Sequence, residues 1–337
     1  MPELSVVIAA YNANATLGLQ LEALTRQQDA PSFEVVIVDN GSDVSPETVV
    51  DAWRSHLEIR LLRAVREQGV AYARNVGLAA ARAPRVVFCD ADDCAGPGFL
   101  RAASSALEHA PFVTGRVQPF SAQTFERGYE HVRDALAVVP NDQAATLVPA
   151  DPTYPVFMGG ASAVMRDDAV ALGGFDQNYV PGAEDNDFGL RVLEAGRSLL
   201  RCADLTLAER RRATSRGTLR RSFDGGRMHM RLCAGHDLWD VSPHLRAPRW
   251  WVDLLRLPLP IMRTFLSRPD AQARLGLAGR CGLRAGQAAG FVTYRVLRRR
   301  VETRRGLGID EGLAQRGRPD DQPSPSEPTA APPVTAS

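Results

Sequence analysis

The segment Val86-Val87-Phe88-Cys89-Asp90-Ala91-Asp92-Asp93 decides how the rest of this chain is interpreted. Its four apolar residues predict a buried β-strand, and three carboxylates follow at the carboxyl end of that strand. Open parallel α/β sheets bind their ligands at this edge, so we expect the acids in a crevice. Crowded carboxylates repel one another unless a cation is present, and Mg²⁺ or Mn²⁺ prefers such oxygen ligands. Considered alone, the segment is equally compatible with a solvated acidic turn.

Strands and helices alternate on both sides of this segment. Apolar runs predict strands at 4–10, 33–38, 58–63 and 86–89, and helical patterns lie between and after them at 15–26, 46–55, 70–81 and 99–108. This alternation predicts right-handed βαβ units around a mainly parallel sheet, which is an α/β fold.

The charges are distributed unevenly along the 337 residues. Residues 1–200 contain 15 Arg and 26 acids, whereas residues 201–306 contain 23 Arg and 8 acids, although the whole chain has a net charge of only +1. An acidic first part suits metal chemistry, and a basic second part suits an anionic surface or partner. Every basic residue is Arg, which excludes a catalytic Lys, and the five Cys lack the spacing of a zinc site.

Targeting signals are not apparent in the sequence. The first residues lack the positive charge of a signal peptide, and we find no run of about 18 uncharged apolar residues, so we expect a cytoplasmic protein without a transmembrane helix. From about Gly306 the chain is rich in Pro, Ser and Ala, and we expect residues 307–337 to be disordered.

Polar residues suited to a nucleotide follow several of the expected strands. The strand at 33–38 ends in Asp39-Asn40-Gly41, and Arg74 lies on the helix at 70–81. An Asp at such a strand end can accept hydrogen bonds from a base or ribose, and an Arg can bind a diphosphate through two parallel hydrogen bonds. Alternatively, Asp39 caps a turn and Arg74 is a solvated helix charge. No G-x-G-x-x-G and no G-x-x-x-x-G-K-[ST] is present, which disfavours a dinucleotide-binding Rossmann site and excludes a P-loop.

Glycine-rich and acidic segments follow in the second hundred residues. Gly159-Gly160 allows a close backbone approach to a sugar or acceptor, and Glu184-Asp185-Asn186-Asp187 begins a helix. Acids in a first helical turn favour the helix dipole, which explains one or two of them. Three acids beside a glycine-rich loop are better explained by a general base with supporting neighbours.

Taken in order, these segments resemble the family 2 glycosyltransferases. The resemblance covers residues 4 to about 200 and runs through SVVIAAYNA, VVIVDNGSD, REQGVAYARNVGLAAA, VVFCDADD, GGFD and AEDNDFGLRVLEAG. It implies a GT-A type nucleotide-sugar-binding fold, a nucleotide-sugar donor, Mg²⁺ or Mn²⁺ at a D-x-D motif, and inversion at the anomeric carbon.

The resemblance also assigns roles to individual residues. Asp185 resembles the catalytic base, and Asp90 and Asp92 match the D-x-D motif, with Asp93 as an adjacent candidate metal ligand. Glu184, Gly159 and Gly160 are expected on the acceptor side. The residues expected at the donor site are Ala10, Tyr11, Asn12, Asp39, Gly69, Arg74, Asn75, Asp90 and Ala91.

The domain organisation predicted from these patterns has three parts. Residues 1–212 form the GT-A domain, residues 213–306 an Arg-rich helical extension, and residues 307–337 the tail. The basic segments at 209–231 and 249–268 either contact an anionic membrane at the inner face of the cell membrane or pack on the catalytic domain. No nucleic-acid partner is expected, because no nucleic-acid-binding module is recognisable.

The predicted activity is transfer of one sugar to an acceptor hydroxyl, such as that of a lipid-linked glycan, in cell-envelope or glycan biosynthesis. The Q-x-x-R-W motif of processive family members is absent, which favours a single addition. One alternative is a nucleotidyltransferase, which would need a glycine-rich phosphate loop after the first strand. Another is a degenerate GT-A domain that only binds nucleotide sugars or glycans.

Overall fold

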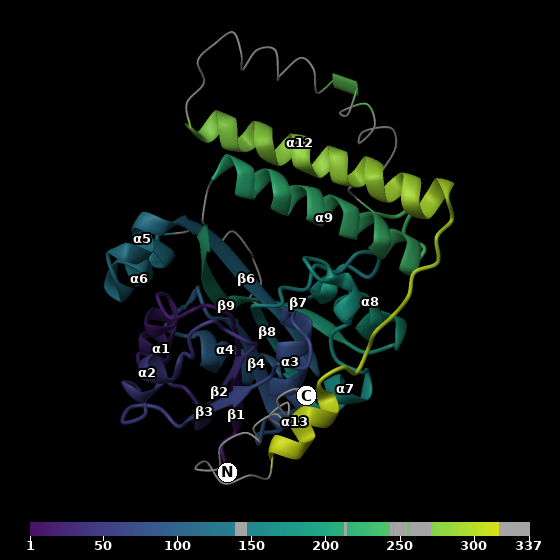
Figure 1. Ribbon diagram of the computed structural model, residues 1–337. Helices are drawn as coiled ribbons and strands as arrows, with labels where there is room; N and C mark the ends of the chain where they lie inside the picture. Colours follow the sequence, from purple (N-terminus) through teal and green to yellow (C-terminus); the bar gives the residue numbers. More distant parts are fainter. Residues whose placement is uncertain are drawn as a thin grey trace, which may run out of the picture.

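A computed structural model describes residues 1–138, 147–211, 214–242, 245, 252, 255–256 and 271–316. The body of the protein is a mixed sheet with helices on both faces, and two long helices lie above it (Figure 1).

The first part of the chain forms the expected parallel βαβ layer. Its elements are β1 (Leu4–Ala10), α1 (Leu17–Thr25), β2 (Phe33–Asp39), α2 (Glu47–Asp51), β3 (Ile59–Arg63), α3 (Val70–Ala80), β4 (Arg85–Asp90) and α4 (Phe99–Ala106). The strands lie side by side in the order β3-β2-β1-β4, and all three pairings are parallel. Because helices cover both faces, apolar side chains on both sides of β1 are fully buried, which explains its continuous apolar sequence.

The second part of the chain extends this sheet beyond β4. Its elements are β5 (Cys94–Ala95), β6 (Phe112–Ser121), α5 (Ala122–Glu126), α6 (Tyr129–Ala137), β7 (Leu147–Pro149), β8 (Ala161–Met165), α7 (Arg166–Ala171), the 3₁₀ turn η1 (Gln177–Tyr179), α8 (Glu184–Glu194) and β9 (Leu199–Arg211). The described residues form nine strands in the order β3-β2-β1-β4-β8-β6-β9-β5, with β7 beside β9. β8 runs antiparallel to both β4 and β6, and β6 pairs with β9 in parallel.

A cluster of aromatic side chains fixes α8 against the sheet. The rings of Phe175 and Phe188 stack with their centroids 4.9 Å apart, and Phe88 of β4 meets Phe175 edge-on at 5.3 Å. All three side chains are buried, and burial of each contributes about 1.5–3 kcal/mol to stability. The apolar positions of the GGFD and AEDNDFG segments therefore place the first turn of α8 near the end of β4.

Two long helices pack closely against each other above the sheet. They are α9 (Ser215–Gly235) and α12 (Ala271–Phe291), followed by one π-helical turn, η2 (Val292–Val296) (Figure 1). A Cβ atom at Gly286 of α12 would overlap the carbonyl oxygen of Phe223 on α9, so glycine permits this close approach. The expected Arg-rich helical extension is thus present. The amphipathic segment expected at 249–268 lies almost entirely outside the described residues, and the domain boundaries at 212 and 306 stay predictions.

The expectation of disorder from residue 307 is wrong for a short helix, α13 (Ile309–Arg316). α13 lies against α3, as Figure 1 shows. Its main chain is held by Arg60, which donates from Nη2 to the Gln315 carbonyl oxygen at 3.0 Å, and Tyr72 donates a hydrogen bond to Glu311. Composition suggested disorder because the Pro- and Ser-rich residues dominate the tail, and residues 317–337 lie outside the described part. No helix among the described residues is long and apolar enough to cross a membrane.

Candidate active site

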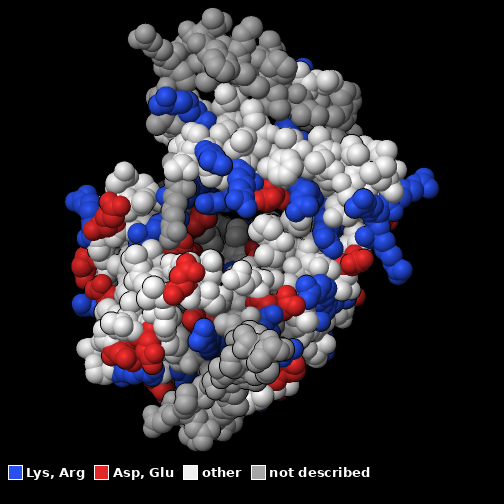
Figure 2. Space-filling model, in the orientation of Figure 1, with Lys and Arg blue, Asp and Glu red and all other residues white. Residues whose placement is uncertain are grey.

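A cavity of about 870 Å³ opens at the carboxyl ends of β1 and β4, the edge predicted from the sequence. Figure 2 shows the hollowed centre of this face, with basic side chains gathered above it over α9. Nine of the predicted site residues line the cavity: Ala10, Tyr11, Asn12, Gly69, Arg74, Asp90, Ala91, Asp92 and Glu184. The lining does not include six others: Asp39, Asn75, Asp93, Gly159, Gly160 and Asp185.

The loops after β1 and β2 are joined by their polar side chains. Asn12 donates from Nδ2 to Asp43 at 2.9 Å, and the main-chain N–H of Asp43 donates back to Asn12 Oδ1 at 2.9 Å. Asp39 is buried, and its Oδ1 accepts a hydrogen bond from the Ser42 main chain at 3.0 Å. Asp39 therefore stabilises the turn after β2, and its contact with a nucleotide stays a prediction.

The loop before α3 is positioned by Asn40. This buried side chain donates to the carbonyl oxygens of Ala64 and Glu67 at 2.6 and 2.8 Å and accepts from the Gly69 N–H at 2.7 Å. Asn40, which follows the strand that the sequence associated with nucleotide binding, thus connects the end of β2 to the segment that enters α3.

Arg74 is the buried centre of the site. Its guanidinium donates to Asp90 Oδ1 at 2.8 Å and to Glu184 Oε1 at 3.4 Å, and it lies 5.5 Å from the ring centroid of Phe175. Burial alone lowers the pKa of Arg74, but Asp90 and Glu184 outweigh it and raise that pKa. Arg74 is therefore a charged connection between α3, the end of β4 and the start of α8, rather than a solvated helix charge.

Gly159 and Gly160 pack against this ion pair. A Cβ atom at Gly159 would overlap the Arg74 guanidinium, and one at Gly160 would overlap the Asp90 carboxylate. The Gly159 N–H also donates to Asp185 Oδ2 at 3.3 Å. These glycines therefore bring Arg74, Asp90 and Asp185 close to one backbone turn.

The two acids at the start of α8 point in different directions. Glu184 Oε2 accepts the main-chain N–H groups of Gly182 and Ala183 at 3.0 and 3.2 Å, so it also stabilises the helix start. Asp185 accepts the Asn186 N–H at 2.7 Å and the Gly159 N–H. Burial, followed by the nearby charge of Glu184, raises the pKa of Asp185 to about 7.

The three acids after β4 have different surroundings. The Asp90 side chain is 34% exposed while it pairs with Arg74, and Asp92 lines the cavity. Asp93 is buried, and its Oδ1 accepts the Arg210 N–H at 3.0 Å. Burial and the charge of Asp90 raise the pKa of Asp93 to about 8. Within the described ranges, no three His, Cys, Asp or Glu side chains are already arranged as a metal site.

Asn75 is used inside the fold. Its Nδ2 donates to the carbonyl oxygens of Phe175 and Leu307, both at 2.9 Å, and its Oδ1 accepts the Phe175 N–H at 2.7 Å. Both ends of the amide are therefore engaged by the chain, and Asn75 connects α3 to the GGFD segment and to the approach to α13.

Arg220 of α9 lines the cavity and was missed as a site residue. The sequence showed it only as one of many arginines in a basic run. Its position depends on how α9 lies over the sheet, and no local spacing indicates that placement. This side chain is exposed and adds a positive charge to a cavity whose other charged lining residues are Arg74, Asp90, Asp92 and Glu184.

Comparison with known proteins identifies the first half of the chain. Residues 5–171 match the family described as Glycosyl transferase family 2. An uncharacterized glycosyltransferase of Haemophilus influenzae is 32% identical over 38% of this chain and 42% of its own length. A second, from Bacillus subtilis, is 26% identical over 57% of this chain and 60% of its own length. The matches thus span less than two thirds of these relatives.

Solved structures agree on the fold. A mannosyltransferase from Pyrobaculum calidifontis, in complex with GDP-Man and Mn²⁺, matches 86% of this chain and 87% of its own with a TM-score of 0.59 and 19% identity. Staphylococcus aureus TarS in complex with UDP-GlcNAc covers 87% of this chain and 92% of its own with a TM-score of 0.51 and 16% identity. The expected GT-A fold is confirmed, and residues 5–171 of the chain belong to glycosyl transferase family 2.

Proposed function

We propose that this protein is an inverting, metal-dependent glycosyltransferase that moves one sugar from a nucleoside-diphosphate sugar to an acceptor hydroxyl in glycan biosynthesis. The observation that carries the proposal is the Arg74 centre, which holds Asp90 and Glu184 at the cavity and brings Asp185 next to the same backbone turn. Family membership supports the reaction class, and relatives with named substrates include a validoxylamine A glucosyltransferase of Streptomyces hygroscopicus.

The donor is expected to lie along the loops after β1 and β2. Its nucleoside would contact the Tyr11 and Asn12 side of the cavity, and its diphosphate would lie between Asp92 and Arg220. Arg220 would donate to the diphosphate oxygens, because a guanidinium matches phosphate geometry.

The residues present fit a divalent metal bound together with the donor. Asp90 and Asp92 offer hard carboxylate oxygens at the cavity, and diphosphate oxygens would complete the coordination. Asp93 fits less well, because it is buried and accepts a main-chain hydrogen bond. When bound, Mg²⁺ or Mn²⁺ supplies positive charge against the leaving diphosphate.

Asp185 would act as the general base. A base works best with a pKa near the working pH, and burial and Glu184 raise the pKa of Asp185 to about 7. In this role Asp185 removes the acceptor hydroxyl proton as the oxygen attacks the anomeric carbon from the face opposite the diphosphate. Gly159 orients the carboxylate by donating its N–H to Oδ2.

The test is Asp185→Asn, assayed with a panel of nucleotide sugars in the presence and absence of Mn²⁺. Donor binding, measured by calorimetry, should change little, whereas turnover of the donor should fall about 10²–10⁴-fold. Asp204→Asn, at an exposed position on β9, is the matched control and should leave both unchanged. Normal turnover in Asp185→Asn would exclude Asp185 as the base.

The products separate the alternatives. A glycosyltransferase releases a nucleoside diphosphate, whereas a nucleotidyltransferase exchanges inorganic diphosphate. A degenerate domain would bind the donor but would transfer its sugar neither to an acceptor nor to water. The acceptor, the cytoplasmic location and an anionic membrane surface as partner stay predictions.

A further inference from the structure

A second cavity, of about 650 Å³, lies at the far end of the long helices. It is formed where α9 ends, where η2 follows α12, and where the chain then runs down toward α13. Five arginines line it, namely Arg295, Arg298, Arg299, Arg300 and Arg305, and no Asp or Glu does. We call this cavity the arginine pocket. In Figure 2, blue side chains cluster at the right-hand edge, where α12 ends in Figure 1.

Within the part of the chain that the structure describes, most of the positive charge in the arginine pocket is not neutralised by an acidic side chain. The side chains of Arg298, Arg299 and Arg300 are exposed and form no ion pair or side-chain hydrogen bond with any described residue. Arg305 has only a long contact, 3.8 Å from Asp176 Oδ2. Glu302, which lies within this stretch of chain, forms no ion pair with these arginines in the described part. Guanidinium groups gathered in this way favour a phosphate, which several of them can bind at once.

Main-chain hydrogen bonds hold the backbone that carries these arginines. The Leu297 N–H donates to the Val292 carbonyl oxygen at 2.9 Å, and the Arg299 N–H donates to the Thr293 carbonyl oxygen at 3.1 Å. Arg298 adopts a left-handed conformation with φ of 48°, so the chain reverses there after η2. Aromatic side chains form another wall, where the Arg295 guanidinium lies 5.5 Å from the Trp239 ring centroid.

Apolar side chains are exposed directly beside these arginines. Val292, Val296 and Leu297 are 49%, 59% and 63% exposed. Single exposed aliphatic residues are ordinary, but three of them next to a cluster of unpaired arginines have the character of a membrane-interface segment. Such a segment places aliphatic groups at the acyl boundary and cations at the phosphates.

We propose that the arginine pocket binds the phosphate group of an anionic lipid headgroup, while Val292, Val296 and Leu297 enter the acyl boundary. The arginine pocket adjoins the C-terminal end of the basic segment at 209–231, because the Arg231 guanidinium lies 5.4 Å from the ring centroid of Tyr179, which lines the pocket. It borders the candidate active site through one short segment, because Tyr179 lines the arginine pocket and Val180 and Pro181 line the donor cavity. The proposal does not depend on the proposed catalytic function, because lipid binding is measured without donor.

The test is binding of the full chain to lipid vesicles. Wild type should float with vesicles of phosphatidylcholine mixed with phosphatidylglycerol and should not float with phosphatidylcholine alone. The combined variant Arg298→Gln, Arg299→Gln and Arg300→Gln should bind the anionic vesicles about 100-fold more weakly, since each arginine near the surface contributes roughly fivefold. Thermal unfolding of the variant is measured first to show that it folds.

A matched triple variant distinguishes the effect of the arginine pocket from the effect of losing three positive charges anywhere on the surface. Arg216→Gln, Arg274→Gln and Arg280→Gln remove the same charge from exposed positions on α9 and α12. This control should keep most of the binding, and an equal loss in both variants would overturn the proposal. Leu297→Ser should weaken vesicle binding at high salt as well as at low salt, because its contribution is apolar.

Inorganic diphosphate distinguishes a soluble ligand from a lipid. Calorimetric binding of diphosphate that is lost in the residue 298–300 variant, without any vesicle binding by wild type, would assign the pocket to a soluble phosphate and overturn the lipid assignment. Absence of both kinds of binding would overturn the pocket as a phosphate site.

Discussion

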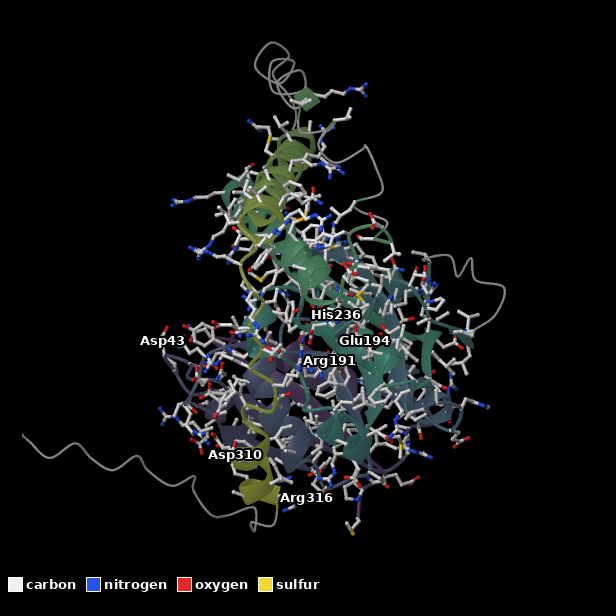
Figure 3. The ribbon with its side chains drawn as sticks, turned by 90° about the vertical axis from the view of Figure 1, so that its right-hand side faces the viewer. Asp43, Arg191, Glu194, His236, Asp310 and Arg316 are labelled. Atoms are coloured by element: carbon white, nitrogen blue, oxygen red, sulfur yellow. The ribbon has the colours of Figure 1, made fainter. Side chains whose placement is uncertain are left out.

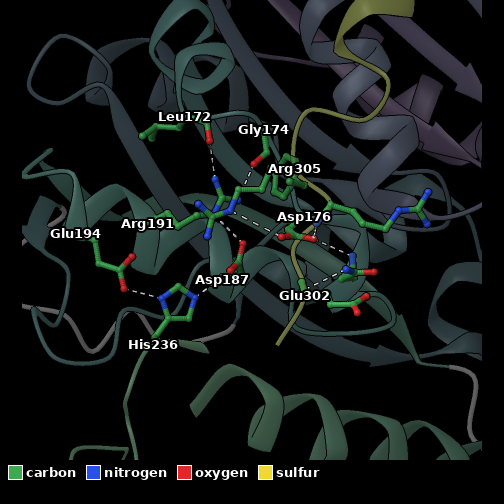
Figure 4. Close-up of polar contacts among 12 residues, drawn as sticks. Leu172, Gly174, Asp176, Asp187, Arg191, Glu194, His236, Glu302 and Arg305 are labelled. Carbon is green, nitrogen blue, oxygen red and sulfur yellow. Dashed lines mark hydrogen bonds and ion pairs between the residues drawn. The ribbon is translucent and has the colours of Figure 1, made fainter. Parts of the chain in front are cut away.

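Replacement of His236 tests whether a buried polar network holds α8 to the long helices. His236 follows the last residue of α9, and Figure 3 places it beside Arg191 and Glu194 of α8. Its Nε2 lies 2.9 Å from Asp187 and its Nδ1 lies 2.6 Å from Glu194, as Figure 4 shows. Both ring nitrogens face carboxylates, so the charged imidazolium, which donates from both, is favoured. Asp187 also accepts from Arg191 Nε at 2.8 Å.

The cost of His236→Ala can be estimated from the surroundings of each bond. The Asp187 carboxylate is fully buried, and a charge-assisted hydrogen bond to such a group is worth about 1.5–3 kcal/mol. The Glu194 side chain is 52% exposed, so its bond adds only about 0.5 kcal/mol after solvent screening. Arg191 still neutralises Asp187 in the variant. We therefore expect a loss of about 2–3 kcal/mol in the free energy of unfolding, which lowers Tm by about 5 °C.

The loss should depend on pH. Burial lowers the pKa of His236, but hydrogen bonds to Asp187 and Glu194 outweigh it and raise that pKa above its usual value. Because the pKa of His236 is higher in the folded than in the unfolded state, its protonation stabilises the folded protein. This contribution is complete at pH values below the pKa of the unfolded state, about 6.5, and is lost as the pH rises through the pKa of the folded state. The difference in Tm between wild type and His236→Ala should thus be large at about pH 6 and much smaller at about pH 9.5. His109→Ala, at an exposed position, is the control. An equal difference at both pH values would refute the charged network.

Three further outcomes follow from the site and the helix pair. Gly160→Ala should displace the carboxylate that pairs with the buried arginine and lower kcat/KM about 100-fold with little loss of secondary structure; unchanged kinetics would show that the carboxylate adapts without cost. With Asp185 as base, kcat/KM should rise with pH up to about 7, and Glu184→Gln should move that limb to lower pH because it removes a neighbouring negative charge; a fixed limb would assign it to another group. Gly286→Leu should separate α9 from α12 and cost about 1–3 kcal/mol in urea unfolding, whereas Gly276→Leu, where the space is open, should cost far less.

The sequence predicted the parallel half of the sheet well, because a strand that is buried on both faces appears in the sequence as a continuous apolar run. Each of the expected strands at 4–10, 33–38, 58–63 and 86–89 is present to within one residue at either end. The antiparallel half of the sheet was harder to predict from the sequence. β8 lies between β4 and β6 although it follows both in the chain, and that order is set by tertiary packing rather than by periodicity. α13 was missed because its stability comes from contacts with α3, far away in the sequence.

In the candidate site, too, positions set by local sequence were predicted and positions set by tertiary packing were not. Positions set by strand ends, such as Asp90, Asp92 and Tyr11, lie at the cavity as predicted. Asn75 lies in a motif that suggested donor binding, yet its amide is used to hold two main-chain segments. Arg220 reaches the cavity from α9, which lies more than a hundred residues after Asp92 in the chain. Sequence pattern gives the strand end and the residue type, but it does not show which neighbour a side chain meets.

The acidic run at the start of α8 is not one functional unit, because helical geometry separates its members. Successive residues on an α-helix point about 100° apart, so adjacent acids face different partners. Glu184 meets the helix start and Arg74, Asp185 meets Gly159, and Asp187 meets Arg191 and His236. Glu184 and Arg74 line the cavity of the candidate active site, Gly159 packs against Arg74, and the third direction leads to the end of α9. One turn of α8 therefore connects the proposed base to the long helices, and a disturbance of the His236 network would reach the active site through this turn.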